Sequence, residues 1–118
     1  MTSTLAGQSD LEAMESLRGK LRLEQTELAK IIGVDPATIY RWRQGESRPR
    51  AIYRSRLVQL QEVFELLTQL FAGPKLAREW LRTATPESLG GSQTPIEVML
   101  GGRIDRVLNT LHFVARGA

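Results

Sequence analysis

The sequence predicts an all-α protein, in which an N-terminal bundle of short helices is joined by one long helix to a small C-terminal helical domain. Apolar residues recur at spacings of three and four through most of the chain, as they do on one face of an α-helix. Few stretches alternate between polar and apolar residues in the manner of a strand. Glycine and proline separate the periodic stretches. With 118 residues, of which 42% are apolar and 25% charged, one ordinary domain or two very small modules can fold.

The first half of the chain predicts three short helices. Residues 1–10 are expected to form a flexible tail, and a helix capped by Asp10 then covers residues 11–21. A second helix covers residues 25–32 and ends at a glycine, which accepts the left-handed conformation common at helix ends. An aspartate–proline pair begins a third helix, over residues 36–44, because the carboxylate accepts from free amides and proline loses no needed donor.

The second half begins with a long helix. Residues 50–71 carry apolar side chains at alternating spacings of four and three, with further apolar residues that widen the stripe. Shorter helices are expected over residues 75–82, over 95–100 and from Ile104 onward, and residues 85–94 are rich in turn-forming residues. The long helix has more apolar surface than so small a domain needs, which predicts self-association. The residues expected at that dimer contact are Leu57, Leu60, Phe64 and Leu67.

The composition excludes several classes of chemistry. There is no cysteine, so the chain forms no disulfide or iron–sulfur cluster, and a single histidine, His112, cannot build a multi-histidine metal site. No cluster of titratable residues suited to catalysis is evident, so we expect neither an enzyme nor a cofactor. The N-terminus lacks the basic and apolar stretches of a signal peptide, and no run of 18 apolar residues occurs. We therefore expect a cytoplasmic protein that does not enter membranes.

Positive charge is concentrated in one short stretch. The chain carries 16 basic and 13 acidic residues, but residues 1–40 have a net charge of −2 and residues 57–118 are balanced. Residues 41–56 hold six arginines against one glutamate, a net charge of +5. The planar guanidinium group suits phosphate oxygens and guanine edges better than the lysine ammonium does. The charge pattern therefore points to nucleic acid.

Residues 23–45 have the layout of a helix-turn-helix, in which the second of two short helices can enter the major groove of DNA. Val34, Ile39 and Trp42 are spaced to bury one face of that second helix, which leaves its other face outward. Arg41 is the candidate for a base contact, since arginine binds a guanine edge through two hydrogen bonds. The other candidates, expected to face the groove or the phosphates, are Gln25, Ala37, Thr38, Tyr40, Arg43, Gln44, Arg48 and Arg50.

A set of residues in and around this segment matches a known pattern. They are Leu23, Gln25, Glu27, Leu28, Ala29, Gly33, Val34, Thr38, Ile39, Trp42, Gly45 and Pro49. The pattern resembles the Xre helix-turn-helix family, over a domain expected to cover residues 11–50. The resemblance implies binding to double-stranded operator DNA by a homodimer, because paired half-sites lie about 34–36 Å apart. Glu24 stands where family members often have a threonine or serine cap, which predicts weaker capping of the helix over residues 25–32.

Residues 51–118 carry a second pattern. It consists of Trp80, Leu81, Pro86, Leu89, Gly90, Gly91, Thr94, Pro95, Ile96, Glu97, Gly101, Arg103, Arg106, Val107 and Leu108. The pattern resembles the toxin-binding domain of the MbcA/ParS/Xre antitoxin family, in which this domain is joined to an Xre-like helix-turn-helix. We expect its apolar members to pack the small domain rather than to bind a partner.

This second resemblance implies an antitoxin that binds and blocks a RES-type toxin, an enzyme with an ADP-ribosyltransferase-like fold that consumes or transfers ADP-ribose from NAD. It also implies that the helix-turn-helix represses the operon encoding both proteins. The C-terminal helices and tail of such antitoxins cover the NAD pocket of the toxin. The toxin contacts expected on that basis are Arg103, Arg106, His112, Arg116, Gly117 and Ala118.

Two alternatives stay open. The chain can be a stand-alone dimeric Xre-type transcription repressor, whose C-terminal half serves only to dimerise and which has no toxin partner. It can also be an enzyme, although the sequence supplies no evident cluster of titratable residues for that role.

Overall fold

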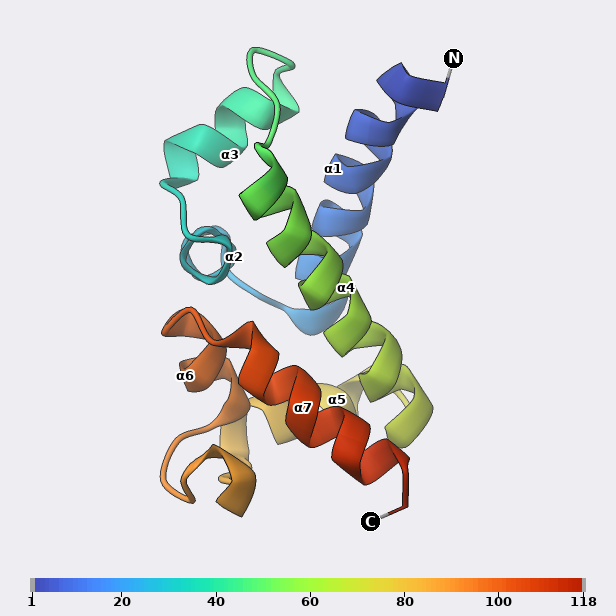
Figure 1. Ribbon diagram of the computed structural model, residues 1–118, viewed down its shortest axis with the longest axis vertical. Coiled ribbons are helices and arrows are strands. Elements are labelled where there is room, and N and C mark those ends of the chain that lie inside the picture. Colours follow the sequence, from blue (N-terminus) through green and yellow to red (C-terminus); the bar gives the residue numbers. More distant parts are fainter. Residues whose placement is uncertain (1, 118) are drawn as a thin grey trace.

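The structure is a computed structural model that describes the backbone of residues 2–117 and the side chains of residues 11–117. Its elements in chain order are α1 (Thr2–Leu21), α2 (Gln25–Ile32), α3 (Pro36–Arg43), α4 (Ala51–Leu70), α5 (Pro74–Thr83), the 3-10 helix η1 (Glu87–Leu89), α6 (Pro95–Leu100) and α7 (Ile104–Ala115). Within residues 2–117 every regular element is a helix, so the predicted all-α fold is confirmed (Figure 1).

The central element of the fold is α4. The N-terminal helices α1 and α2 pack against it, and α7 crosses its C-terminal half (Figure 1). At the C-terminal end of the molecule α6 packs against both α5 and α7, while α2 also contacts α6. The long axis measures 42 Å, and α3 and the end of α7 lie toward opposite ends of it (Figure 1). The long helix thus connects two surfaces that lie toward opposite ends of the molecule (Figure 1).

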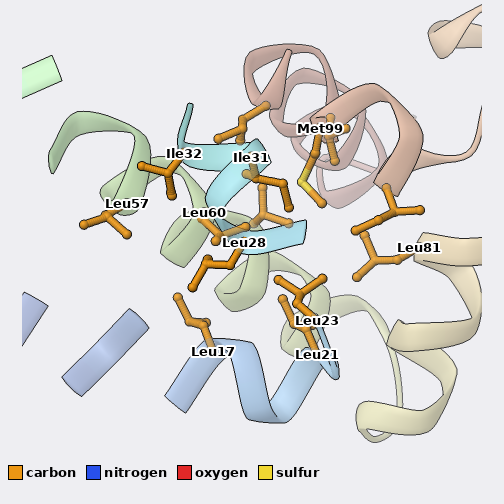
Figure 2. Packing of buried hydrophobic residues seen from close by; sticks show 14 of the residues in the cluster. Leu17, Leu21, Leu23, Leu28, Ile31, Ile32, Leu57, Leu60, Leu81 and Met99 are labelled. Carbon is orange, nitrogen blue, oxygen red and sulfur yellow. The ribbon is translucent and has the colours of Figure 1, made fainter. Parts of the chain in front are cut away.

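One continuous hydrophobic core runs through both halves of the chain. Figure 2 shows Leu28 of α2 and Leu60 of α4 in the same cluster as Leu81 of α5 and Met99 of α6. All four side chains are at most 1% exposed. The predicted boundary between residues 50 and 51 therefore does not separate two cores, because α4 packs on the N-terminal helices with one part of its apolar surface and on α7 with another.

Three of the four residues predicted at a dimer contact belong to this core. Leu57, Leu60 and Leu67 are at most 6% exposed. The fourth, Phe64, is half-buried, and the ammonium nitrogen of Lys20 lies 5.3 Å from the centroid of its ring. Leu57, Leu60 and Leu67 are therefore corrected from a dimer contact to the interior of the chain itself, because α1 and α7 cover the stripe that the periodicity left without a partner, whereas a dimer contact at Phe64 stays a prediction.

The first helix begins earlier than the sequence predicts. It starts at Thr2, so the predicted tail over residues 1–10 is helical from that point and Asp10 lies inside the helix instead of capping it. No proline interrupts residues 2–21, and a glycine inside a helix costs only about 1 kcal/mol relative to alanine. Continued helical hydrogen bonding through Asp10 therefore outweighs its local preference for a cap.

The predicted ends of the other helices agree with the structure to within one residue. Residues 85–94 form turns around the single element η1, as expected. At the start of α2 the Glu24 side chain makes no capping hydrogen bond, in agreement with the weaker capping predicted for it. The backbone N–H of Glu24 instead donates to Oε1 of Glu27 at 2.9 Å, so the carboxylate of Glu27 satisfies a free donor at this helix end.

Candidate DNA-binding and partner-binding surfaces

The third helix presents a polar face away from the core. Ile39 and Trp42 are at most 3% exposed and hold α3 against the rest of the bundle. The Trp42 ring lies 6.1 Å from the ring of Tyr53 on α4, which ties α3 to the central helix as well. Because these residues occupy one face, the predicted groove-facing residues lie on the other. Exposed there are Ala37, Tyr40, Arg41, Arg43 and Gln44, while Thr38 is half-buried.

Arg41 and Thr38 form a pair on this outer face. The Arg41 Nη2 donates to the Thr38 hydroxyl oxygen at 3.1 Å, one helical turn nearer the start of α3. The guanidinium group is therefore directed along the helix toward its N-terminal half, which is the half that contacts base edges in helix-turn-helix proteins. This placement suits the base contact predicted for Arg41.

Arg43 is bound to α1. Its Nε and Nη2 lie 2.8 and 2.7 Å from Oε2 of Glu15. Glu15 in turn pairs with Nε of Arg18 at 3.1 Å. Arg43 therefore anchors the end of α3 to the first helix, and the phosphate contact predicted for it must compete with Glu15 for the guanidinium group.

Arg48 and Arg50 lie on the loop between α3 and α4, and both side chains are exposed. Pro49 between them is buried, so the loop is held against the protein while the two arginines point to solvent. Gln25 is the first residue of α2 and is half-buried. Such positions, on a loop and at a helix start, are typical of phosphate contacts that orient a protein on DNA.

The turn between α2 and α3 is closed by an arginine that the sequence did not single out. Nη1 of Arg56, on α4, donates to the carbonyl oxygen of Ile32 at 2.7 Å. Gly33 follows with a φ of 94°, and a Cβ atom there would collide with the same nitrogen. The left-handed backbone therefore favours glycine at this position, and any side chain there would also displace the end of Arg56 from the Ile32 carbonyl.

The predicted partner-binding residues lie on and around α7, and several already have contacts within the chain. Arg103 makes two hydrogen bonds to Asp105, at 3.1 and 3.0 Å, which raise the pKa of Arg103 and lower that of Asp105. Nη2 of Arg106 donates to the carbonyl oxygen of Ser88 at 3.4 Å. These contacts hold two of the predicted arginines in fixed positions at the start of the helix.

The end of α7 carries the other predicted residues. Nε2 of His112 lies 2.7 Å from Oε2 of Glu62, which ties α7 to α4 on the protein surface. Arg116 and Gly117 are exposed just after the helix. Ala118 lies outside the described residues. The structure thus brings His112, Arg116 and Gly117 to one end of the molecule, while Arg103 is at the other end of the same helix.

Phe113 and its neighbour Val114 are exposed apolar residues on α7 that the sequence analysis did not single out, and Phe113 is the aromatic one. Its side chain is 56% exposed. It borders a hollow of about 260 Å³ whose other lining residues are Ser88, Arg106, Asn109 and Thr110. Arg106, Asn109 and Phe113 follow one another at spacings of three and four, so they share a face opposite the buried residues of the helix. That spacing was visible in the sequence, but an aromatic residue in an apolar stripe is more often buried.

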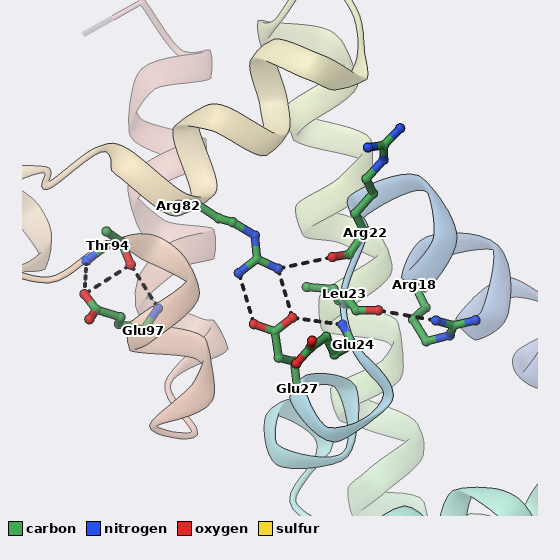
Figure 3. A network of polar contacts seen from close by, with 8 residues as sticks. All are labelled: Arg18, Arg22, Leu23, Glu24, Glu27, Arg82, Thr94 and Glu97. Atoms are coloured by element: carbon green, nitrogen blue, oxygen red, sulfur yellow. Dashed lines mark hydrogen bonds and ion pairs between the residues drawn. The ribbon is translucent and has the colours of Figure 1, made fainter.

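A polar network ties α5 to the first turn of α2 (Figure 3). The Arg82 guanidinium donates to both carboxylate oxygens of Glu27, at 3.0 and 2.9 Å, and to the carbonyl oxygen of Arg22 at 3.2 Å. The hydrogen bonds from Arg82 lower the pKa of Glu27, and those to Glu27 raise the pKa of Arg82. Nearby, Nη1 of Arg78 donates to the carbonyl oxygen of Lys20 at 3.2 Å. These contacts link α5 to the end of α1, to the loop after it and to the first turn of α2.

The described part of the chain holds neither a metal-binding cluster nor a membrane-spanning helix. No group of three or more histidine, aspartate or glutamate residues there is placed to hold a metal ion. No helix among the same residues is both long and apolar enough to cross a membrane.

The α3 surface lies in a region that matches a known protein family. The family model named helix-turn-helix matches residues 14–53, which include α2, α3 and the loop that carries Arg48 and Arg50. The chain therefore contains a helix-turn-helix domain over about a third of its length.

Most of the chain is also similar to known antitoxins. It is 26% identical over 98 residues to the mycobacterial cidal antitoxin MbcA of Mycobacterium tuberculosis H37Rv, across 83% of this chain and 84% of that protein. The match to MbcA of Mycobacterium bovis has the same identity and coverage. Among solved structures, a chain of the M. tuberculosis MbcT–MbcA toxin–antitoxin complex has the same fold, with a TM-score of 0.66 and 22% identity over 92% of this chain and 95% of that chain. The similarity therefore extends beyond the helix-turn-helix to the C-terminal helices.

Proposed function

We propose that this chain, an antitoxin of the Xre/MbcA type with a helix-turn-helix domain, uses its two surfaces for two partners. The α3 surface binds operator DNA and represses the operon that encodes the antitoxin. The α7 surface binds and blocks a RES-type toxin that consumes NAD. The single observation that carries the proposal is that the similarity to MbcA covers 83% of the chain, well beyond the helix-turn-helix match over residues 14–53. The chain is then a regulator and inhibitor rather than an enzyme.

The exposed face of α3 supports DNA binding as the function of the first surface. Arg41 is directed along the helix by Thr38, and Arg48 and Arg50 are exposed on the adjoining loop. A guanidinium group in the groove can read a guanine edge, and arginines beside it can bind phosphates. Two copies of the chain are needed to occupy paired half-sites, so we propose that a homodimer binds the operator.

The α7 surface has the character of a protein interface. Phe113 is an exposed aromatic side chain with polar neighbours around it, including Arg106 and Asn109. A few aromatic and arginine side chains usually provide most of the binding energy in such interfaces. Arg116 and Gly117 extend the surface beyond the helix and can enter a cleft of the partner. A toxin that consumes NAD works in the bacterial cytoplasm, where we place this complex.

Co-expression tests the toxin partner. The chain is produced with the product of the adjacent gene, the complex is isolated by affinity pull-down, and cellular NAD is measured. We expect a stable complex and restored NAD. The variant Phe113→Ala should lose the complex, whereas Val58→Ala, which removes an equally exposed apolar side chain from α4, should keep it. Absence of any complex, with DNA binding intact, would leave the stand-alone repressor as the function.

A reporter assay tests repression. The DNA upstream of the gene is placed before a reporter, and the chain is supplied separately. We expect repression by the unchanged protein and its loss in Arg41→Ala, which lacks the proposed base contact. Sedimentation of the protein with and without this DNA gives the number of chains bound. Full reporter expression in the presence of the folded chain would contradict the proposal.

A further inference from the structure

The carboxylate of Glu27 is held from two directions. Within α2 it accepts the backbone N–H of Glu24 at 2.9 Å, and from α5 it accepts both arms of the Arg82 guanidinium at 3.0 and 2.9 Å. Its side chain is 18% exposed, and that of Arg82 is 40% exposed. Figure 3 shows Arg82 reaching across to the first turn of α2, with the Arg22 carbonyl beside it. One residue of the C-terminal half therefore fixes the start of a helix-turn-helix element.

The same turn belongs to the part of the molecule assigned to DNA. Gln25, a candidate phosphate contact, opens α2 and stands two residues before Glu27. Glu24 adds a second carboxylate to this turn. Without a cation beside them, two carboxylates repel a phosphate backbone and also weaken the favourable field of the helix start. Arg82 cancels one of these charges and directs the Glu27 carboxylate toward α5.

We propose that Arg82, in the C-terminal half, is a positioning residue for operator binding: it neutralises the Glu27 carboxylate at the first turn of α2 and holds that carboxylate toward α5, away from the DNA. The inference rests on the DNA-binding function proposed above. Arg82 acts through Glu27 and does not itself contact the DNA. The toxin-binding half of the chain thereby sets the DNA affinity of the other half.

Three full-length variants test this role, with a labelled fragment of the DNA upstream of the gene as the probe. Arg82→Gln leaves the Glu27 carboxylate without its cation, and we expect it to weaken binding of the fragment by about 5- to 20-fold. Glu27→Gln combined with Arg82→Gln removes the uncompensated charge, so binding should return to within about 2-fold of the unchanged protein. The double variant still lacks the ion pair, so its melting temperature should not recover with the affinity.

Arg78→Gln is the matched control. Arg78 lies one turn earlier on α5 and donates to a backbone carbonyl of the N-terminal half, that of Lys20 at 3.2 Å. Its loss removes another link between the halves, one hydrogen bond where Arg82 makes three, and leaves Glu27 paired with Arg82. We expect binding of the fragment to stay within about 2-fold of the unchanged protein.

The outcomes separate this inference from the function on which it rests. If the unchanged protein binds the fragment and Arg82→Gln binds it equally well, the positioning role is wrong while DNA binding stands. If Arg82→Gln weakens binding but the double variant gives no recovery, Arg82 acts by a direct phosphate contact, and the salt dependence should then lose about one unit of slope. If the folded, unchanged protein does not bind the fragment, the DNA-binding function fails and the inference fails with it.

Discussion

The surfaces on α3 and α7 differ in what they offer a partner. On α3 the guanidinium group of Arg41 is held by a neighbouring hydroxyl, and two more arginines are exposed on a loop. On α7 the arginines near the start of the helix already bind an aspartate and a carbonyl of the same chain, and the exposed feature is the ring of Phe113. Charge suits phosphates, and an apolar anchor with fixed polar neighbours suits a folded protein. Added salt should therefore weaken DNA binding steeply and toxin binding little.

The largest expected effect comes from a substitution in the hydrophobic core, which supports both the α3 surface and the α7 surface. Leu60 lies in the shared core and is fully buried on α4. Leu60→Ala should lower the free energy of unfolding by about 2–5 kcal/mol, because it leaves a cavity between helices of both halves. Urea unfolding followed by circular dichroism measures this. Two separate transitions, with only one of them shifted, would contradict a common core.

The next largest effect concerns the affinity of the α7 surface for the proposed toxin. Phe113→Ala should weaken toxin binding by about 2 kcal/mol or more, as expected for an aromatic anchor, and leave DNA binding unchanged. Calorimetric titration with the purified toxin gives the affinity, and a gel shift gives the DNA control. Unaltered toxin affinity would move the partner contact away from this face.

A smaller effect distinguishes two kinds of contact at α3. Arg41→Ala should cost about 1–3 kcal/mol for the operator and relax its base preference. Arg48→Ala should weaken all sequences alike and lower the slope of affinity against salt by about one. Titrations across salt concentrations and operator variants measure both. Equal behaviour of the two variants would contradict the assignment of base and phosphate contacts.

The smallest effect concerns the link between the halves. The pKa of Glu27 is lowered in the folded protein by its hydrogen bonds to Arg82, so folding favours the ionised carboxylate. The resulting stability is present above the pKa of the unfolded chain and is lost as the pH falls through the lower, folded value. Because the pair is partly exposed, it should contribute about 0.2–1 kcal/mol. Thermal unfolding of the unchanged chain and of Glu27→Gln between pH 7 and pH 3 should converge at the acid end.

Local signals in the sequence predicted the helix-turn-helix well. Gly33 adopts the left-handed backbone that ends α2, and Pro36 begins α3 as predicted, although the Asp35 carboxylate makes no capping hydrogen bond. The exposed face of α3 then follows from the burial of Ile39 and Trp42. Within the helix-turn-helix, where the backbone depends mainly on neighbouring residues, the sequence was sufficient to predict the two helices and the turn between them.

Features that depend on distant residues were not predictable in the same way. The apolar stripe of α4 was assigned to a dimer, because periodicity shows that a face is buried but not which chain covers it. The Arg82–Glu27 contact joins residues 55 positions apart and leaves no periodic signal. Phe113 was passed over for the opposite reason, since it lies among apolar residues but on the outward face of α7.

The continuous core through α4 limits how such proteins can diversify. A new toxin specificity cannot be acquired simply by recombining one C-terminal half onto another N-terminal half at the loop before α4. The incoming α4 must also fit the foreign α1 and α2, whose buried leucines and isoleucines interlock with it. If the two surfaces have the proposed functions, selection on toxin recognition also constrains residues at the DNA-binding end, and the two specificities are expected to evolve together rather than as interchangeable parts.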